Sequence, residues 1–363
     1  MRIMRRLVFV LLVSSLALTL TSMRYGGIPV VRASPTIYQG NLVLTGNNVT
    51  TITGTFNING SILVENNATL ILRNAVVNFT QTSPHQFSMT LQNPSNGNPR
   101  LIIENTTVLS GGYDILILFY ANSSCTADHV SASRDNVHFW LNDLSHVFMS
   151  NSSVFAVIDY GDLFEGNNCS INQFQLFQSG SANVSSSNIY NLLCWSSGGV
   201  IVSDSAIVSV STEYGSLVQL VNSTYSYYGA YDTSRVTVSW YLGVNVVDSH
   251  GTPVGSANVT ASYSNATVAE SKLTEANGLA RLTLMQKTIN ATGSYPVGNY
   301  TITAEYGLNT GQESVNMTGN NEITISLLFT VPELQSVLVL PVFIAATLIA
   351  VAALKRKRSA RQA

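Results

Sequence analysis

Acidic side chains recur through this 363-residue chain at steps that could bring them together on neighbouring strands. Asp114, Asp135 and Asp159 follow one another at similar intervals, and a comparable interval separates Asp143 from Glu165. Paired strands lie about 4.8 Å apart, and two carboxyl groups about 5 Å apart are the catalytic arrangement of a retaining glycosidase. These residues are therefore the candidates for acid–base chemistry on a polysaccharide.

The surrounding sequence argues against that chemistry. The densest polar stretch, residues 128–146, contains His129, His138 and His146, whose spacings of nine and eight do not form a local metal-binding motif. The same stretch holds Arg134. Only 10% of residues are charged, so acids at matching intervals also arise by chance, and the chain lacks the motifs of polygalacturonase-like enzymes. We expect solvated corners and loops here, with no catalytic, metal-binding or cofactor-binding residues; polysaccharide binding or cleavage is the alternative.

Asparagine triplets of the form Asn-x-Ser/Thr are a stronger signal. The chain has 34 Asn, and its Ser and Thr content predicts about seven such triplets by chance, yet 15 occur. Asn93-Pro94-Ser95 is disqualified by its proline. We predict glycosylation at fourteen: Asn48, Asn59, Asn67, Asn78, Asn105, Asn122, Asn151, Asn183, Asn222, Asn258, Asn265, Asn290, Asn299 and Asn316. Asn168 is left out because Cys169, the middle residue of its triplet, is expected to point inward.

Strand parity supports this prediction in the C-terminal region. Asn258, Asn299 and Asn316 alternate with apolar or aromatic neighbours, which places all three on a polar strand face. The alternative is that Asn, Ser and Thr are simply the residues that corners require, so the triplets follow from turn chemistry alone.

The N-terminus predicts a secretory signal peptide. Three arginines precede an uncharged run from Leu7 to Leu20, which is shorter than the about 20 residues needed to span a bilayer. A basic segment followed by a short apolar one is typical of a signal. We assign residues 1–33 to it, with a retained anchor as the alternative.

The C-terminus predicts a membrane span. Leu334 to Leu354 is free of charge and long enough to cross a bilayer of about 30 Å. Lys355, Arg356, Lys357 and Arg358 follow it, which places the tail in the cytoplasm and the rest of the chain outside. Together with Pro332 and Glu333, this end resembles the PEF-type sorting signals of archaeal surface proteins, although Leu334 stands where those signals have Phe. The resemblance implies that the helix is removed and replaced by a lipid.

Charge and cysteine content narrow the possible partners. Without the ten basic residues of leader and tail, seven basic residues face 19 acidic ones, a net charge of about −12. Such a surface excludes nucleic acid as a partner.

The chain has three cysteines, Cys125, Cys169 and Cys194. A disulfide framework would need more cysteines and an even number of them. We expect three buried thiols, with one disulfide and one remaining thiol as the alternative.

The region 34–239 contains short β-branched runs broken by Asn, Gly and Ser, with no helical periodicity. A polar residue recurs after an apolar strand, at Asn74, Asn105, Asp128, Asn151, Asn172, Ser187, Asp204 and Asn222. Repeats with a period on the order of 20 residues indicate stacked units. Gly60-Ser61-Ile62 and Asn67-Ala68-Thr69-Leu70 also resemble the first coils of β-helix surface proteins. We predict a right-handed parallel β-helix with these residues at its corners.

The pattern changes at residues 240–328. Val244 and Val246 alternate with polar residues, Asn277-Gly278 predicts a tight turn, and residues 300–306 alternate again. This segment resembles carboxypeptidase-regulatory-like and transthyretin-like β-sandwich modules, which implies a spacer or binding accessory. Trp140, Trp195 and Trp240 are expected in the core or at junctions. Tyr225, Tyr227, Tyr228 and Tyr231 are expected to cap the β-helix, with stacking on sugar rings as the alternative.

The sequence thus predicts an all-β protein: signal 1–33, β-helix 34–239, sandwich 240–328, linker and span 329–354, and tail 355–363. Its expected role is a membrane-tethered extracellular glycoprotein that serves in cell-surface structure, display or adhesion. Its expected partners are the membrane, surface polysaccharide and other envelope proteins.

Overall fold

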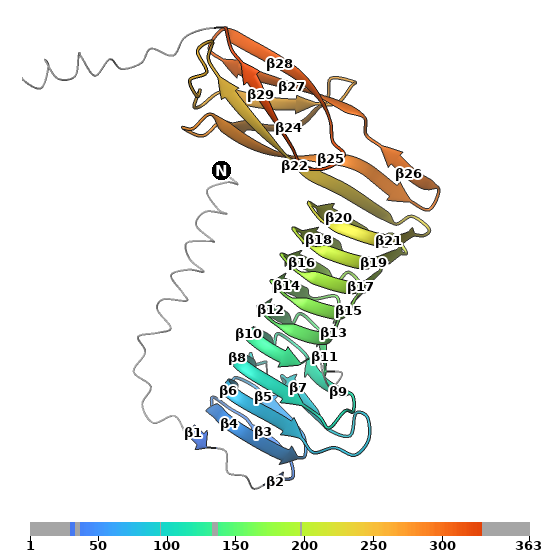
Figure 1. Cartoon of the computed structure of the whole chain (residues 1–363). Coiled ribbons are helices and arrows are strands. Elements are labelled where there is room, and N and C mark those ends of the chain that lie inside the picture. The colour runs from blue at the N-terminus through green and yellow to red at the C-terminus, as the bar shows by residue number, and fades with distance from the viewer. Residues whose placement is uncertain (1–29, 33–36, 95, 133–136, 197, 329–363) are drawn as a thin grey trace, which may run out of the picture. The chain divides into compact units, whose positions relative to one another are not determined.

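A computed structural model describes residues 30–32, 37–94, 96–132, 137–196 and 198–328 (Figure 1). These residues form β-strands and turns and no helix. Among them, therefore, no helix is long and apolar enough to cross a membrane. The predicted signal, the predicted span and the basic tail lie outside the described residues.

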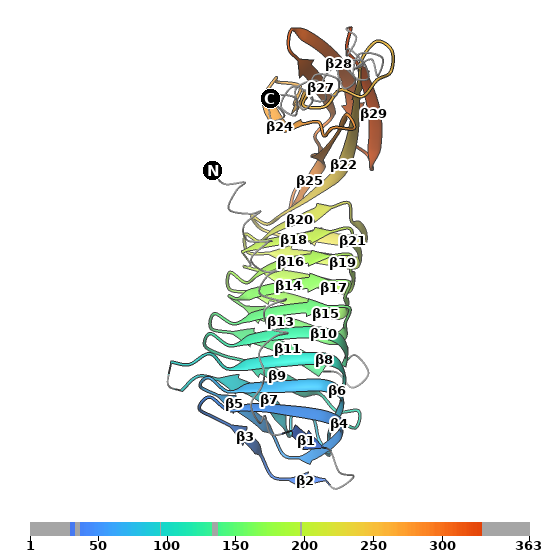
Figure 2. The same ribbon diagram turned by 90° about the vertical axis from the view of Figure 1, so that its left-hand side faces the viewer.

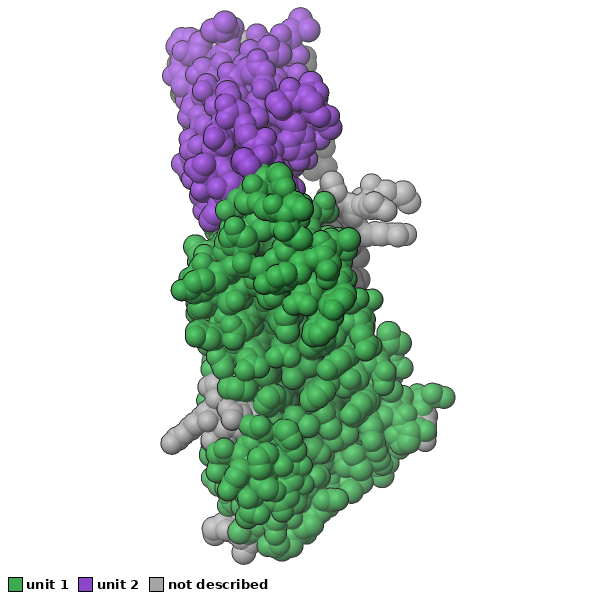
Figure 3. All heavy atoms as spheres, turned by 90° about the vertical axis from the view of Figure 1, so that its right-hand side faces the viewer, with its two compact units in different colours: residues 1–238, 287–295 green, residues 239–286, 296–363 purple. Residues whose placement is uncertain are grey.

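The chain divides into two compact units, coloured separately in Figure 3. The first comprises residues up to Val238 together with Lys287–Tyr295, and the second comprises Ser239–Gln286 and the residues from Pro296 onward. Residues 287–295 belong to the first unit, whereas the sequence pattern places them in the predicted sandwich of residues 240–328.

The first unit is a parallel β-solenoid of about 11 turns. Its first half contains β1 (Val30–Arg32), β2 (Tyr38–Gln39), β3 (Leu42–Leu44), β4 (Val49–Asn59), β5 (Ile62–Glu65), β6 (Thr69–Phe79), β7 (Ser88–Gln92), β8 (Arg100–Leu109), β9 (Ile115–Phe119), β10 (Ser124–Ala132) and β11 (Val137–Asn142). Its second half contains β12 (His146–Ser150), β13 (Ser153–Tyr160), β14 (Leu163–Asn167), β15 (Ser170–Phe177), β16 (Ser181–Ser185), β17 (Asn188–Trp195), β18 (Gly199–Ser203), β19 (Ala206–Glu213), β20 (Leu217–Val221) and β21 (Thr224–Ala230).

Each strand pairs in parallel with the strand one turn away, as Figure 2 shows. In the second half the register advances by the same interval at each turn, from Glu165 to Asn183 to Ile201 to Gln219. Alternate side chains point inward, and the core contains Phe79, Phe119, Phe139, Phe164 and Phe174. Cys125, Cys169 and Cys194 are buried as predicted, and they form no disulfide with one another.

The corners of the solenoid carry residues with positive φ. Asn74, Asn105, Asn151, Asp204 and Asn222 occupy them as predicted, with φ between 47° and 51°. The remaining three predictions are wrong by one or four positions: the corner residues are His129, Asn168 and Ser186 rather than Asp128, Asn172 and Ser187. Short polar side chains tolerate this conformation. The residue directly after each corner points inward, so it lies only one position from the corner residue.

The second unit packs an antiparallel sheet against a second layer. The sheet has the order β24 (Val268–Leu273), β23 (Asn258–Ser262), β27 (Asn299–Tyr306) and β28 (Asn309–Asn316). The second layer pairs β22 (Arg235–Val247) in parallel with β29 (Asn321–Ser326) and includes β25 (Leu279–Asn290). The end of β25 and most of the following strand, β26 (Gly293–Pro296), belong to the first unit.

The core between these layers follows the predicted alternation. Val244, Val246, Tyr300 and Ile302 are fully buried in one cluster. Tyr306, predicted on the same face, is instead 42% exposed because it lies at the very end of β27.

Candidate functional site

The acids predicted to form a catalytic pair do not line up. Asp159 pairs in register with Leu141, and Leu141 with Phe119, so Asp114 does not belong to the column of Asp159. Asp135 and Arg134 lie outside the described residues. Glu165 pairs in register with Phe148, and its carboxylate lies 3.7 Å from His146 on an exposed face. The interval in sequence therefore does not translate into one shared position in successive turns.

Asp159 lies inside the solenoid, where a substrate cannot reach it. Its side chain is fully buried between Leu141 and Leu176 of the adjacent turns. One carboxyl oxygen accepts the backbone N–H of Asp162 at 2.8 Å, and the other has no hydrogen-bond partner among the described residues. Burial, with a smaller contribution from the nearby carboxyl of Asp162, raises the pKa of Asp159 to about 7. This group affects stability rather than catalysis.

The histidines are scattered. His129 Nδ1 lies 2.8 Å from Asp128 at a corner. His138 is near His85, with ring centroids 6.5 Å apart, and His85 Nε2 lies 3.8 Å from Asp114. Burial lowers the pKa of His138 below its usual value. Within the described ranges, no three His, Cys, Asp or Glu residues are arranged to hold a metal ion.

An aromatic ladder runs along the outside of the solenoid and was not predicted. Its members, one for each of five successive turns, are Trp140, Tyr160, Phe177, Trp195 and Tyr214. Consecutive ring centroids are 4.9 to 6.0 Å apart, and three of the four contacts are stacked. The nearly constant interval between these aromatic residues in the sequence could have revealed it. Because each ring covers the face of the next, the ladder offers mostly ring edges to a ligand.

The prediction of a core or junction position is wrong for Trp195, which is 42% exposed, and right for Trp240, whose indole N–H donates to Gln286 beside the second unit's core. The predicted tyrosine cap is also mostly wrong. Tyr227, Tyr228 and Tyr231 are at least 50% exposed. Only Tyr225 is covered, with Lys287 Nζ 5.6 Å from its ring centroid.

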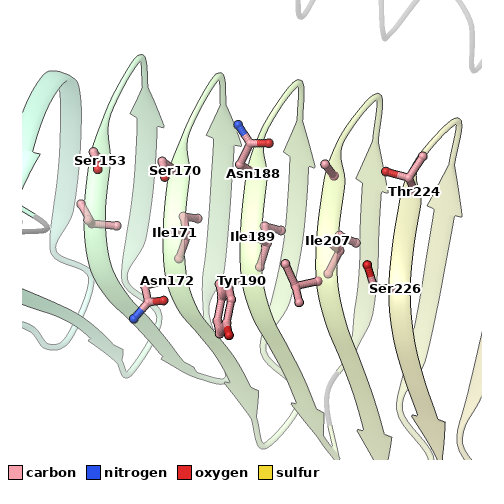
Figure 4. Close-up of a pocket in the computed structure, with 13 residues that line it drawn as sticks. Ser153, Ser170, Ile171, Asn172, Asn188, Ile189, Tyr190, Ile207, Thr224 and Ser226 are labelled. Atoms are coloured by element: carbon pink, nitrogen blue, oxygen red, sulfur yellow. The ribbon is translucent and has the colours of Figure 1, made fainter.

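A groove of about 510 Å³ crosses the outside of β13, β15, β17, β19 and β21 (Figure 4). One row of its lining follows the register of successive turns: Ser153, Ser170, Asn188, Ala206 and Thr224. A second row, with Asn172 and Tyr190, lies further along the same strands (Figure 4). The five strands span about 19 Å at about 4.8 Å per strand, so the groove suits an extended ligand.

The lining of this groove is uncharged and mixes polar with apolar residues. It contains no Asp, Glu, His, Cys, Lys or Arg. Of its apolar members, Val154, Ile171, Ile189 and Ile207 are buried core residues, whereas Ala206 is exposed and Val208 is half-buried. The other accessible side chains are hydroxyls and amides, together with the phenol of Tyr190, which is 57% exposed. The lining offers hydroxyl, amide and phenol groups and no carboxyl, imidazole or amine, so the arrangement suits binding.

The fourteen predicted glycosylation residues all reach the surface. Ten are exposed: Asn48, Asn59, Asn67, Asn105, Asn122, Asn151, Asn183, Asn265, Asn299 and Asn316. The other four are half-buried: Asn78, Asn222, Asn258 and Asn290. Asn168, which was left out, is also exposed although Cys169 does point inward. Accessibility therefore gives no reason to treat Asn168 differently.

Several of these asparagines also hold the corners together. The side-chain amide of Asn105 donates to Asn74 at 2.7 Å, and that of Asn168 donates to Asn151 at 2.8 Å. The next residue is often a buried serine, whose hydroxyl accepts a backbone N–H from the neighbouring turn. Val130 N–H donates to Ser152 Oγ, directly after Asn151, at 3.0 Å in this way. Corner geometry thus selects Asn followed by Ser, but it does not supply the Ser or Thr that a glycosylation triplet needs at its third position.

Comparisons with known proteins assign no family. No family model matches the chain, and no curated protein matches it. A crystal structure of the shaft pilin SpaA from Lactobacillus rhamnosus GG is similar over 25% of this chain, with 12% identity and a TM-score of 0.21. The match spans 48% of the pilin, about half its length. We draw no conclusion about fold or function from so low a TM-score.

Proposed function

We propose that this protein is a membrane-tethered extracellular glycoprotein that serves as a rigid scaffold for display or adhesion at the cell surface. The observation that supports this proposal best is the exposure of the Asn-x-Ser/Thr asparagines. All 15 reach the surface of the described structure, and they are spread over both units. Attached sugars would then cover the outer walls of the solenoid and the sandwich.

The proposed scaffold role follows from how the solenoid is built. Its turns are joined by continuous parallel strand pairing, by the buried serine hydroxyls and by the corner asparagines. Repeat architectures of this kind gain stability from each neighbouring turn. A stack held together by backbone pairing at every turn resists bending, which suits a stalk.

The remaining parts of the proposal rest on sequence. The signal 1–33 would export the chain, and Leu334 to Leu354 with Lys355 to Arg358 would tether it. A PEF-type sorting signal at Pro332 and Glu333 would exchange the helix for a lipid, and the second unit would act as a transthyretin-like spacer.

Mass spectrometry of the protein purified from its native cells tests this proposal. We expect a new N-terminus near Ala33, sugars on several of the predicted asparagines, and either an intact or a removed C-terminal helix. Asn93 is an internal control because Pro94 blocks its triplet, so it should remain unmodified. Protease treatment of intact cells provides a second readout, since an external solenoid is accessible to it. A bare chain that intact cells protect from protease would contradict the proposal.

A further inference from the structure

We propose that the groove across β13, β15, β17, β19 and β21 binds an extended chain of an uncharged polysaccharide. The site was not among the sequence candidates, which centred on residues 128–146. It combines three features: a hollow form, an uncharged lining that includes hydroxyls and amides, and the exposed ring of Tyr190.

The polar groups of the groove are free to bind a ligand. In the part of the chain that the structure describes, the side chains of Ser153, Ser170, Asn172, Asn188 and Thr224 make no hydrogen bond to another residue. The corner asparagines and ladder serines nearby are in contrast engaged across turns. Groups that bond only to water in the free protein can exchange that water for the hydroxyls of a sugar.

The charge of the site selects the class of polymer. None of the lining residues carries a cationic group that would pair with a uronate, sulfate or phosphate. The proposed extracellular part has a net charge of about −12, which repels anionic chains. An uncharged polysaccharide meets no such penalty, and its hydroxyls match the serine, threonine and asparagine side chains of successive turns.

Tyr190 provides the stacking surface. It is 57% exposed in the lining of the groove, and no aromatic contact to it is found among the described residues. The rings of the aromatic ladder are covered by one another, as Trp195 and Tyr214 show with centroids 5.3 Å apart and planes 7° apart. A sugar ring needs an open aromatic face, and Tyr190 offers one inside the groove.

The lining also argues against a peptide ligand. Bound peptides are anchored by apolar side chains in pockets or by backbone pairing at an open sheet edge. Here the buried isoleucines are already packed in the core, and β13, β15, β17 and β19 have strand partners on both sides. The groove therefore lacks both means of holding a peptide.

The test is titration of the detergent-solubilised full chain with soluble neutral glucans, mannans and galactans, with polygalacturonate as the anionic comparison. Calorimetry reports the affinity. We expect binding of at least one neutral polymer and weakening by about tenfold or more in Tyr190→Ala, as for a central aromatic contact. Asn188→Ala should also weaken binding. Neither Asn188 nor Tyr190 belongs to a glycosylation triplet, so the variants keep the same sugars.

Tyr214→Ala is the matched control, because Tyr214 is 56% exposed and lies at the end of the aromatic ladder rather than in the groove. It should bind as the parent does. Equal losses in the two tyrosine variants, binding of polygalacturonate alone, or no binding of any neutral polymer would each overturn the proposal. Circular dichroism checks that both variants fold. The cell-surface role is measured separately by mass spectrometry and protease access, so either proposal can fail alone.

Discussion

The buried carboxyl of Asp159 makes the stability of the solenoid depend on pH. Burial raises its pKa from 3.8 to about 7. Between about pH 4 and pH 7 the folded chain therefore keeps a proton on this group that the unfolded chain has lost. The contribution of this group to the free energy of unfolding should fall as pH rises through this window and become level above it, while His138, whose pKa burial lowers, contributes with the opposite sign. The pKa difference corresponds to about 4 kcal/mol in total.

Asp159→Asn should remove most of this dependence. An amide oxygen can still accept the N–H of Asp162, while the charge that forms above pH 7 is gone. We expect the variant to be more stable than the parent by up to about 4 kcal/mol at about pH 8 and nearly equal to it at about pH 4. The pKa of Asp162 is also raised by burial, so a smaller slope of the same sign should remain.

Urea denaturation of the full chain at a series of pH values, followed by far-UV circular dichroism, measures this effect. Asp232→Asn is the matched control, since Asp232 is exposed and its positive φ also suits Asn. That variant should follow the parent at every pH. An Asp159→Asn variant whose stability has the same slope as that of the parent between about pH 4 and pH 7 would refute the reasoning, because the contribution of His138 is common to both.

The same denaturation assay checks three further predictions. Ser205→Ala should lower the free energy of unfolding by about 1–3 kcal/mol, because the buried N–H of Ser187 loses its acceptor. Cys169→Ser should raise it by about 1 kcal/mol, since Cys169 occupies a ladder position where a hydroxyl bonds better than a thiol. Gly278→Ala should cost more than Gly251→Ala. Both have φ near 80°, but only at Gly278 would a Cβ meet a backbone oxygen, at 2.6 Å.

The sequence predicted the architecture correctly at positions where a particular backbone conformation strongly favours one residue type. Asn or Asp at positive φ marked five of eight corners correctly, at Asn74 and Asn151 for example. His129 and Ser186 escaped because neither residue type is a strong signal for that conformation. The inward position of Asp159 was hidden for another reason. Residues 156–159 are all buried, so the alternation that separates inside from outside disappears there.

The groove and the aromatic ladder depend on how successive turns stack. The sequence of a single segment does not predict that stacking. Ser153 and Thr224 lie far apart in the sequence yet belong to one row. Only an accurate register over five turns brings them together. The intervals used to propose catalytic acids were of similar size, but a shift of a few positions places Asp114 and Asp159 in different columns.

The corner chemistry has a practical consequence for anyone who edits this chain. Two requirements meet in the side chains of Asn105, Asn151, Asn168 and Asn222. The fold needs their positive φ and the hydrogen bonds of their amides, and a glycosyltransferase needs them as the first residue of its triplet. Swapping such an asparagine for glutamine would confuse a lost sugar with a broken corner. Replacing the third residue of the triplet instead, as in Thr107→Val, removes the glycosylation signal and leaves the corner asparagine in place.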